Sequence, residues 1–335
     1  MRVVNIDKPV LIEDLSHDGR GIARVNGKVV FIEGALPGET VSYGLYKQKK
    51  DFDEGVTLEV LQASPDRVEP KCPHFGICGG CSLQHLSSKG QLHYKNMHWV
   101  QLMKKMGAGS PEILLEPLQT HPWHYRRKAR LGVKYVAKKE KTLLGFREKH
   151  SPQYIIDMQD CFILDSQFQK HIPRVIELIN QLPSKSVIAQ IELAVGDTVA
   201  LVFRNLQALN DEDLSLLKEF GQDTGFKIYL QPKGPDSLIL LYPEHASFEL
   251  QFELEIAKAQ ITFEPLDFIQ VNRQMNEAMI AQALELLELK DTDEVLDLFC
   301  GLGNFTLPLA RRVRKVYGVE AVSYTHLTLP TILRV

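Results

Sequence analysis

The sequence predicts a multidomain protein that combines α+β and α/β parts in three successive regions. Short β-rich runs separated by turns occupy residues 1–64 and predict an N-terminal OB-like β-barrel. A cluster of cysteines then opens a central β-rich domain. Near residue 300, a short apolar run followed by a glycine turn predicts the start of a Rossmann-like domain, which we expect to be incomplete.

Five short strands are expected in the barrel, because β-branched and aromatic residues alternate there with turn residues. The dipeptide Asn26-Gly27 between two such runs is a strong hairpin signal. Barrels of this kind often bind single-stranded RNA, and Lys47, Lys49 and Tyr43 supply a modest basic and aromatic surface. A barrel without any ligand is the alternative. The expected strands are Val10–Glu13, Gly21–Val25, Lys28–Ile32, Thr40–Lys47 and Gly55–Leu61.

Three cysteines lie close together after the barrel, in the order Cys72, Cys78 and Cys81. Glycines between the last two let the backbone curl so that thiolates converge on one centre. A tetrahedral zinc site or a four-cysteine cluster needs a fourth ligand. Cys161 is one candidate, and His74 and His85 compete with it in favour of zinc. Spacing alone leaves both the metal and the fourth ligand open.

The middle of the chain combines helices with strands. Gln91–Met106 is expected to form an amphipathic helix whose apolar face, which includes Trp99, Leu102 and Met106, belongs to the core. Two further helices and four strands are expected downstream. They are His171–Leu182 and Asp211–Phe220 as helices, and Val187–Val195, Thr198–Arg204, Lys227–Leu230 and Ser237–Leu241 as strands.

A basic stretch opens the central region and points to RNA. The whole chain has a net charge of −3, yet residues 121–150 hold ten Lys and Arg against two Glu, which gives +8 locally. Arginines interleaved with aromatic residues contact phosphates and stack on bases. A solvated charged face is the plainer alternative. The candidate RNA-binding residues are Arg126, Arg127, Lys128 and Arg130.

The Rossmann-like start is predicted by a strand, a glycine turn and a helix. Val295–Phe299 is expected as a buried strand, and Gly301 and Gly303 then allow a ligand to approach the backbone. Asn304 can cap the helix expected over Phe305–Val313. Such a unit places a ligand at the carboxyl ends of its strands.

An acid follows the second strand of this unit. Glu320 comes after the apolar run Val316–Val319, where it can accept hydrogen bonds from both hydroxyls of a ribose. Residues 297–303 follow the pattern D-x-F-x-G-x-G, which looks like the first motif of S-adenosylmethionine-dependent methyltransferases. Upstream, Gln270 and Asn272 precede a helix expected over Arg273–Leu289, where they face the methyl donor or merely cap the helix.

Several motifs then agree in one order: H-D-G-R-G-I-A-R, C-x5-C-G-G-C-S-L-Q-H, Y-R-R-K-A-R, D-x-Q-D-C, D-F-I-Q-V-N and V-L-D-L-F-C-G-L-G-N-F-T. The first resembles the TRAM domain of RNA-modifying proteins. Together they resemble the bacterial 23S rRNA uracil-C5-methyltransferases that carry an iron–sulfur cluster, over about residues 10–321. The resemblance implies 23S rRNA as substrate. It implies a [4Fe–4S] cluster on Cys72, Cys78, Cys81 and Cys161, and S-adenosylmethionine on Gln270, Phe299, Asn304 and Glu320.

The resemblance also implies a covalent mechanism, in which a cysteine thiolate adds to C6 of uracil and a base removes the C5 proton. In this family both groups lie in a later part of the catalytic domain, so we expect none of the catalytic residues here. Cys300 is expected to be a small buried residue. Residues 322–335 resemble vector-derived sequence, so we expect a truncated, inactive fragment with a non-native tail.

Bulk properties place the protein in the cytoplasm. No run reaches the roughly 18 apolar residues of a membrane helix, and five scattered cysteines do not predict a secreted disulfide framework. We expect a monomer without membrane contact. A non-catalytic RNA-binding protein with a zinc or iron–sulfur module, and an electron-transfer iron–sulfur protein, are the alternatives. The expected domains are the barrel (1–64), the central domain (65–90 and 110–263), the methyltransferase part (91–109 and 264–321) and the tail (322–335).

Overall fold

The computed structural model describes residues 3–109 and 111–321. The chain divides into two compact units, Met1–Gln119 and Thr120–Val335, which are described separately below. The finer division into domains stays a prediction. In the part of the chain that the structure describes, no helix combines the length and the apolarity that crossing a membrane would need.

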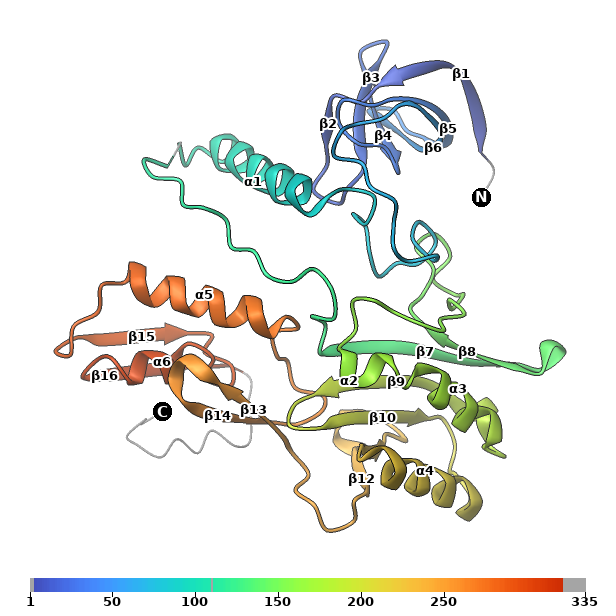
Figure 1. Cartoon of the computed structure of the whole chain (residues 1–335), viewed down its shortest axis with the longest axis vertical. Coiled ribbons are helices and arrows are strands. Elements are labelled where there is room, and N and C mark those ends of the chain that lie inside the picture. Colours follow the sequence, from blue (N-terminus) through green and yellow to red (C-terminus); the bar gives the residue numbers. More distant parts are fainter. Residues whose placement is uncertain (1–2, 110, 322–335) are drawn as a thin grey trace. The chain divides into compact units, whose positions relative to one another are not determined.

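A curled six-stranded sheet forms the first part of the N-terminal unit (Figure 1). Its strand order is β1-β5-β6-β4-β3-β2, and the curling brings β1 into contact with β3. Four expected strands are confirmed, but the first, Val10–Glu13, is wrong, because Val10 and Leu11 end β1 and the next two residues connect it to β2. The strands are β1 (Val4–Leu11), β2 (Asp14–Leu15), β3 (Gly21–Val25), β4 (Lys28–Glu33), β5 (Thr40–Gln48) and β6 (Phe52–Gln62).

The turn between β3 and β4 confirms the hairpin expected at Asn26-Gly27. Both residues have positive φ, 51° for Asn26 and 81° for Gly27, as a two-residue type I′ turn requires. The strands pair directly on either side, with Val25 opposite Lys28. This tight turn sets the register that places Ala23, Val30 and Ile32 in the barrel core.

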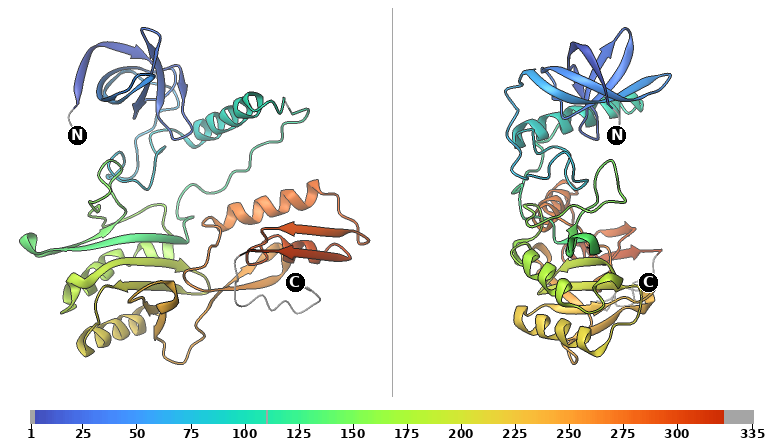
Figure 2. Two further views of the ribbon diagram at one scale, coloured as in Figure 1. Left: turned by 180° about the vertical axis from the view of Figure 1, so that it is seen from behind. Right: turned by 90° about the vertical axis from the view of Figure 1, so that its right-hand side faces the viewer.

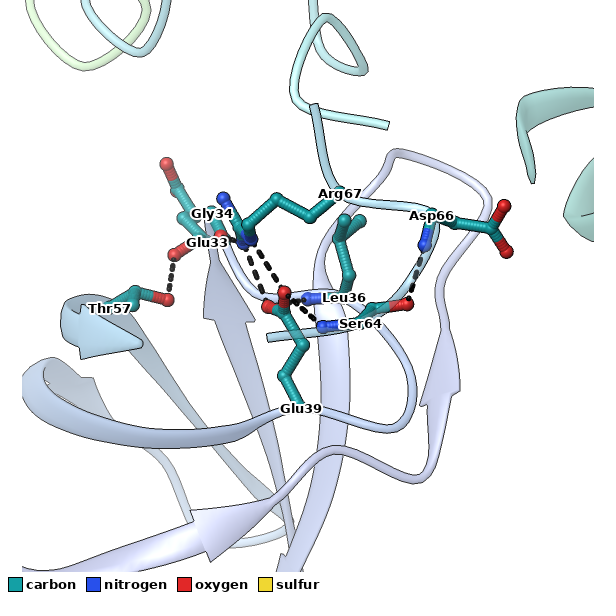
Figure 3. A network of polar contacts seen from close by, with 8 residues as sticks. All are labelled: Glu33, Gly34, Leu36, Glu39, Thr57, Ser64, Asp66 and Arg67. Carbon is teal, nitrogen blue, oxygen red and sulfur yellow. Dashed lines mark hydrogen bonds and ion pairs between the residues drawn. The ribbon is translucent and has the colours of Figure 1, made fainter. Parts of the chain in front are cut away.

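A buried carboxylate ties the segment after β6 to the barrel (Figure 3). Glu39 has no exposed surface, and its two oxygens lie 2.5 and 2.7 Å from Nε and Nη2 of Arg67. The backbone N–H groups of Leu36 and Ser64 donate to the same carboxylate. Arg67 also donates to the carbonyl of Gly34. The cysteine-bearing segment therefore leaves the barrel in a fixed direction.

Helix α1 (Ser88–Lys105) follows, with the Ser87 hydroxyl accepting from the N–H of Gly90 at its start. The apolar face of this helix was expected to belong to the core, and this expectation is wrong for most of that face. Trp99 and Leu102 are 45% exposed and Met106 is 74% exposed. A helical period shows that a face is apolar, but it does not show what covers that face.

The C-terminal unit is built on a second six-stranded sheet of order β12-β11-β10-β9-β7-β8, in which only β10 and β11 pair in parallel. Helices α3 and α4 contact one another and cover one face of it (Figures 1 and 2). The expected helices and strands are confirmed. The elements are β7 (Lys128–Val136), β8 (Lys141–Gly145), α2 (Ser166–Gln169), α3 (Ile172–Gln181), β9 (Ile188–Val195), β10 (Val199–Asn205), α4 (Asp211–Thr224), β11 (Lys227–Leu230) and β12 (Ile239–Tyr242).

A hairpin and a parallel strand pair complete this unit. Tyr229 of the sheet, Ile280 of α5 and Val316 of β16 belong to one core, so the two parts share their packing. The parallel pairing of β15 with β16 is confirmed. The elements are β13 (Leu250–Leu254), β14 (Ala259–Phe263), α5 (Arg273–Leu286), β15 (Glu294–Leu298), α6 (Thr306–Ala310) and β16 (Lys315–Val319).

Two expectations about this strand pair need correction. The strand expected to be buried is covered on one face only, because Leu296 and Leu298 of β15 are 58% and 57% exposed. The following helix, α6, begins at Thr306 and ends at Ala310, so it is shorter than expected.

Candidate functional site

The turn after β15 and the acid after β16 meet at the carboxyl ends of the two parallel strands. The backbone N–H of Gly301 donates to Oε2 of Glu320 over 2.8 Å. Gly301 and Gly303 have positive φ, 54° and 85°, so the turn depends on glycine at both positions. Phe299 also adopts positive φ, and its side chain is 85% exposed. The arrangement leaves a carboxylate and a left-handed turn beside one another, as a ribose-binding site needs.

A reciprocal amide pair fixes this turn to α5. The side chains of Asn276 and Asn304 donate to one another over 2.7 and 2.8 Å. Asn276 is only 2% exposed. The helix-capping role expected for Asn304 is wrong, since α6 begins at an N-cap of Phe305 with no side-chain cap. Asn304 is instead bonded to a helix that lies earlier in the chain.

Cys300 lies inside the turn and is buried, as expected. A Cβ atom added to Gly318 of β16 would lie 3.1 Å from Sγ of Cys300. The thiol therefore packs directly on the neighbouring strand. Burial raises the pKa of the Cys300 thiol, and the Asp297 carboxylate raises it further. At neutral pH this thiol is protonated, which makes it a poor nucleophile. Asp297 itself accepts a hydrogen bond of 2.6 Å from Thr306.

The segment before α5 carries two of the polar candidates. Asn272 is the N-cap of α5, and its side chain accepts from the N–H of Met275 over 3.0 Å, which confirms the capping alternative. The Gln270 side chain is exposed, and its carbonyl accepts from Nε of Arg127 over 2.8 Å. Gln270 is thus held by its backbone, while its amide faces outward.

The basic stretch divides between interior and surface. Arg127 is 4% exposed and its guanidinium lies 4.1 Å from the ring centre of Phe252. The Lys128 ammonium donates to the carbonyl of Asp267. Burial lowers the pKa of Arg127 to about 10 and that of Lys128 to about 8.

The other two basic residues are more accessible. Arg130 keeps 69% of its side chain exposed and donates to Glu192 over 2.7 Å. Half-buried Arg126 donates to the Lys128 carbonyl. The four side chains therefore do not form one continuous basic surface.

The expected nucleic-acid surface of the barrel is smaller than predicted. Tyr43 is only 2% exposed and belongs to the barrel core, so it cannot stack on a base. Lys47 pairs with Glu54 over 3.1 Å, and the ammonium of Lys49 lies over the ring of Phe52. Side chains along β5 alternate between the core and the surface, and this alternation places Tyr43 in the core. The sequence pattern did not show which side chains of β5 point inward.

The cysteine loop belongs to the N-terminal unit, and its half-buried Cys72, Cys78 and Cys81 form no disulfide. The N–H of Gly80 donates to Sγ of Cys78 over 3.4 Å. Burial raises the pKa of the Cys78 thiol, and the nearby Cys81 and Cys72 raise it further, which shows that the three groups sense one another. Cysteine sulfur is the donor type of a thiolate-bound metal centre, and the N–H of Gly80 would stabilise a thiolate on Cys78.

Two further observations concern this centre. Cys161 belongs to the C-terminal unit, forms no disulfide and is 8% exposed. Among the described residues, no group of three or more His, Cys, Asp or Glu is already arranged to hold a metal ion. His85 is buried, and its ring centre lies 5.2 Å from the ring centre of Phe75. Both residues lie in the same segment as the cysteine loop.

Comparison with known proteins identifies the family. The family model described as tRNA (Uracil-5-)-methyltransferase matches residues 87–328. The chain belongs to the tRNA (uracil-5-)-methyltransferase family. A TRAM domain model matches residues 5–42, which confirms the TRAM resemblance of the barrel.

Relatives within the family are close. The 23S rRNA (uracil(1939)-C(5))-methyltransferase RlmD of Legionella pneumophila (strain Lens) is 49% identical over 310 residues, which are 92% of this chain and 70% of the relative. RlmD of Xanthomonas campestris pv. campestris (strain 8004) is 49% identical over 313 residues, with the same coverage. These relatives confirm the resemblance to 23S rRNA uracil-C5-methyltransferases.

A solved structure supports the fold of the family. The crystal structure of Pyrococcus abyssi tRNA (uracil-54, C5)-methyltransferase in complex with S-adenosyl-L-homocysteine aligns with a TM-score of 0.66 and 20% identity. The alignment covers 93% of this chain and 73% of the other. The Pyrococcus abyssi structure therefore has the same overall fold as this chain.

The sequence pattern did not indicate the roles of Asn276, beside the glycine turn, and of Arg127, in the basic stretch. Asn276 was not singled out, although an asparagine on the inner face of an otherwise apolar helix is a signal for a buried amide partner. Arg127 was taken for a surface residue. Arg127 directly precedes β7, which begins at Lys128, and the sequence did not show where that strand begins.

Proposed function

We propose that this protein transfers a methyl group from S-adenosylmethionine to C5 of a uridine in 23S rRNA. The contact between Gly301 and Glu320 carries the proposal, because it places a carboxylate beside a glycine turn at the carboxyl ends of two parallel strands. Family membership, and the RNA named for the relatives, support the reaction and the substrate.

The methyl donor would be held by four residues of the C-terminal unit. Glu320 accepts hydrogen bonds from the ribose hydroxyls, while the exposed ring of Phe299 borders the turn. Asn304, fixed by Asn276, and the outward amide of Gln270 supply polar contacts. S-adenosylmethionine brings the electrophilic methyl group, and the protein orients it against the base.

Replacing Glu320 with glutamine is expected to weaken binding of S-adenosylmethionine roughly tenfold to a hundredfold, as loss of charged hydrogen bonds implies. Glutamine keeps an acceptor for the Gly301 N–H, so the turn itself survives. Isothermal titration calorimetry measures the effect. Glu294→Gln is the matched control, because Glu294 is exposed on the adjacent strand and pairs with Arg314. Equal affinities for the Glu320 and Glu294 variants would refute the ribose assignment.

We further propose that Cys72, Cys78, Cys81 and Cys161 bind a [4Fe–4S] cluster. The donor set of the cysteine loop supports this, and four thiolates suit iron–sulfur binding better than a set with imidazole. When bound, such a cluster would cross-link the two segments that carry these four cysteines. His74 or His85 with zinc is the competing assignment.

Cys161→Ser is expected to lose the visible absorbance of the cluster and most of its iron, and to lower the thermal midpoint. Ligands from distant segments close a long loop, whose entropy the metal offsets. Iron content and absorbance of anaerobically purified protein measure the effect. Cys300→Ser serves as control, since it removes a buried thiol without touching the cluster. Full iron and an unchanged midpoint in Cys161→Ser would reject Cys161 as the fourth ligand.

We propose a monomer of the cytoplasm that binds RNA through the barrel and the accessible part of the basic stretch. We also propose that the nucleophile and the base of the reaction lie outside these 335 residues, so that the chain alone binds RNA without transferring a methyl group. The buried, protonated state of Cys300 supports this proposal.

A further inference from the structure

A cavity of 290 Å³ lies in the C-terminal unit, behind the basic stretch. Trp123 and Tyr125 line it beside Arg127, Asp165 and Phe252. Its size is at the lower end of the range for small-molecule pockets, which suits one planar base better than a larger ligand. Aromatic walls favour a flat ring system.

Arg127 gives this cavity a specific chemistry. Its Nε is already used by the carbonyl of Gln270. Neither terminal nitrogen has a hydrogen-bond acceptor among the described residues, although both are fully buried. Stacking on Phe252 fixes the plane of the guanidinium. The burial-lowered pKa of about 10 still leaves Arg127 charged at neutral pH. A buried cation with two unused donors in one plane calls for a pair of acceptors.

The Arg127 and Arg273 guanidiniums and the Asp165 carboxylate bring charges of both signs to the cavity. Two phosphate oxygens would satisfy Arg127, but an RNA phosphate offers Asp165 no hydrogen-bond donor and leaves the aromatic walls unused. Guanine instead offers O6 and N7 as acceptors, the pair that arginine binds most often, and N1–H and N2–H as donors on another edge.

We propose that this cavity takes the guanine base of one unstacked nucleotide of the RNA substrate, with O6 and N7 accepting from Arg127. The proposal deepens the RNA-directed function above and rests on it. The base enters the cavity as a specificity contact beside the methylation site. Trp123 and Tyr125 border its ring, and Arg127 rejects bases that lack the acceptor pair.

Binding of short oligoribonucleotides to the whole protein tests this. The probes are oligouridine, the same oligomer with one guanosine, and the same oligomer with one 7-deazaguanosine, which lacks only the N7 acceptor. One guanosine is expected to tighten binding roughly tenfold over oligouridine, and 7-deazaguanosine is expected to lose most of that gain. Arg127→Lys is expected to abolish the preference, because lysine cannot offer the two-donor fork. Arg174→Lys is the matched control and is expected to keep the preference, because Arg174 of α3 pairs with Asp223 and does not line the cavity.

A second variant keeps the test decisive where Arg127→Lys does not fold. Asp165→Asn can still cap α2, where Asp165 accepts from the N–H of Gln167. It is expected to reduce the preference for guanosine over inosine, which lacks the N2 donor. Equal binding of all oligomers would overturn the guanine pocket and leave RNA binding intact. Competition by inorganic phosphate in wild type but not in Arg127→Lys would assign the cavity to a phosphate. If no oligomer and no 23S rRNA bound, the proposed function would fail instead.

Discussion

Glu39→Ala is expected to lower the opening free energy of the barrel by about 3 kcal/mol, the lower end of the range for breaking a buried ion pair. The variant removes the acceptor of four donors at once and leaves the Arg67 charge without its partner (Figure 3). Arg67 retains some exposure, with 24% of its side chain accessible, so water offsets part of the loss.

Hydrogen exchange of the amides in β3 and β4 measures this opening, since it reports on one part of a chain with two units. Glu13→Ala is the matched control, because Glu13 pairs with Arg24 at 3.7 Å with both side chains about half exposed. Exposed pairs contribute at most about 1 kcal/mol. Similar exchange in both variants would contradict a stabilising role for the buried carboxylate.

The same carboxylate gives the barrel a dependence on pH. Burial raises the pKa of Glu39, but hydrogen bonds from Arg67, Leu36 and Ser64 outweigh burial and hold the pKa below its ordinary value. The stabilisation is therefore complete above the unfolded-state pKa of about 4.3 and is lost as pH falls through the folded-state pKa. The difference between wild type and Glu39→Gln should stay constant from neutral pH to about pH 5 and shrink below about pH 4.

Elements with strong local signals were predictable from the sequence. Asn26-Gly27 fixes its hairpin through backbone conformation alone, and the run before Gly301 is a strand because its pattern and its turn agree. The covered face of α1 was not predictable, because coverage depends on segments distant in sequence. The start of β1 was missed because the strand is irregular between Ile6 and Val10.

The candidate site was predictable in outline and not in detail. Glu320 and the glycine turn follow from strand order, since both lie at carboxyl ends of neighbouring parallel strands. The amide pair of Asn276 and Asn304 joins residues 28 positions apart, and no local pattern indicates which asparagine meets which. Burial of Arg127 depends on Phe252 of β13, which lies far along the chain. The periodicity of apolar residues does not indicate which residues distant in sequence contact one another.

The 335-residue chain is expected to bind RNA and to transfer no methyl group to it. C5 of uracil is too weak a nucleophile to take a methyl group until a thiolate has added to C6. Of the five thiols, three lie together in the cysteine loop, Cys161 is buried, and Cys300 is packed against Gly318 with a raised pKa. A reactive cysteine is accessible and has a lowered pKa, whereas Cys300, the thiol inside the cofactor turn, is buried and has a raised pKa.

Transfer of a labelled methyl group from S-adenosylmethionine to unmodified 23S rRNA measures the reaction, and filter binding of the same RNA across a salt series measures the complex. Binding should weaken steeply with salt, because phosphate contacts release counterions. The Glu320→Gln variant separates the two activities, since it should bind RNA like wild type and bind the methyl donor poorly. Turnover by the wild-type chain that disappears in Cys300→Ala would make Cys300 the nucleophile, and the buried thiol would then have to become exposed when RNA binds.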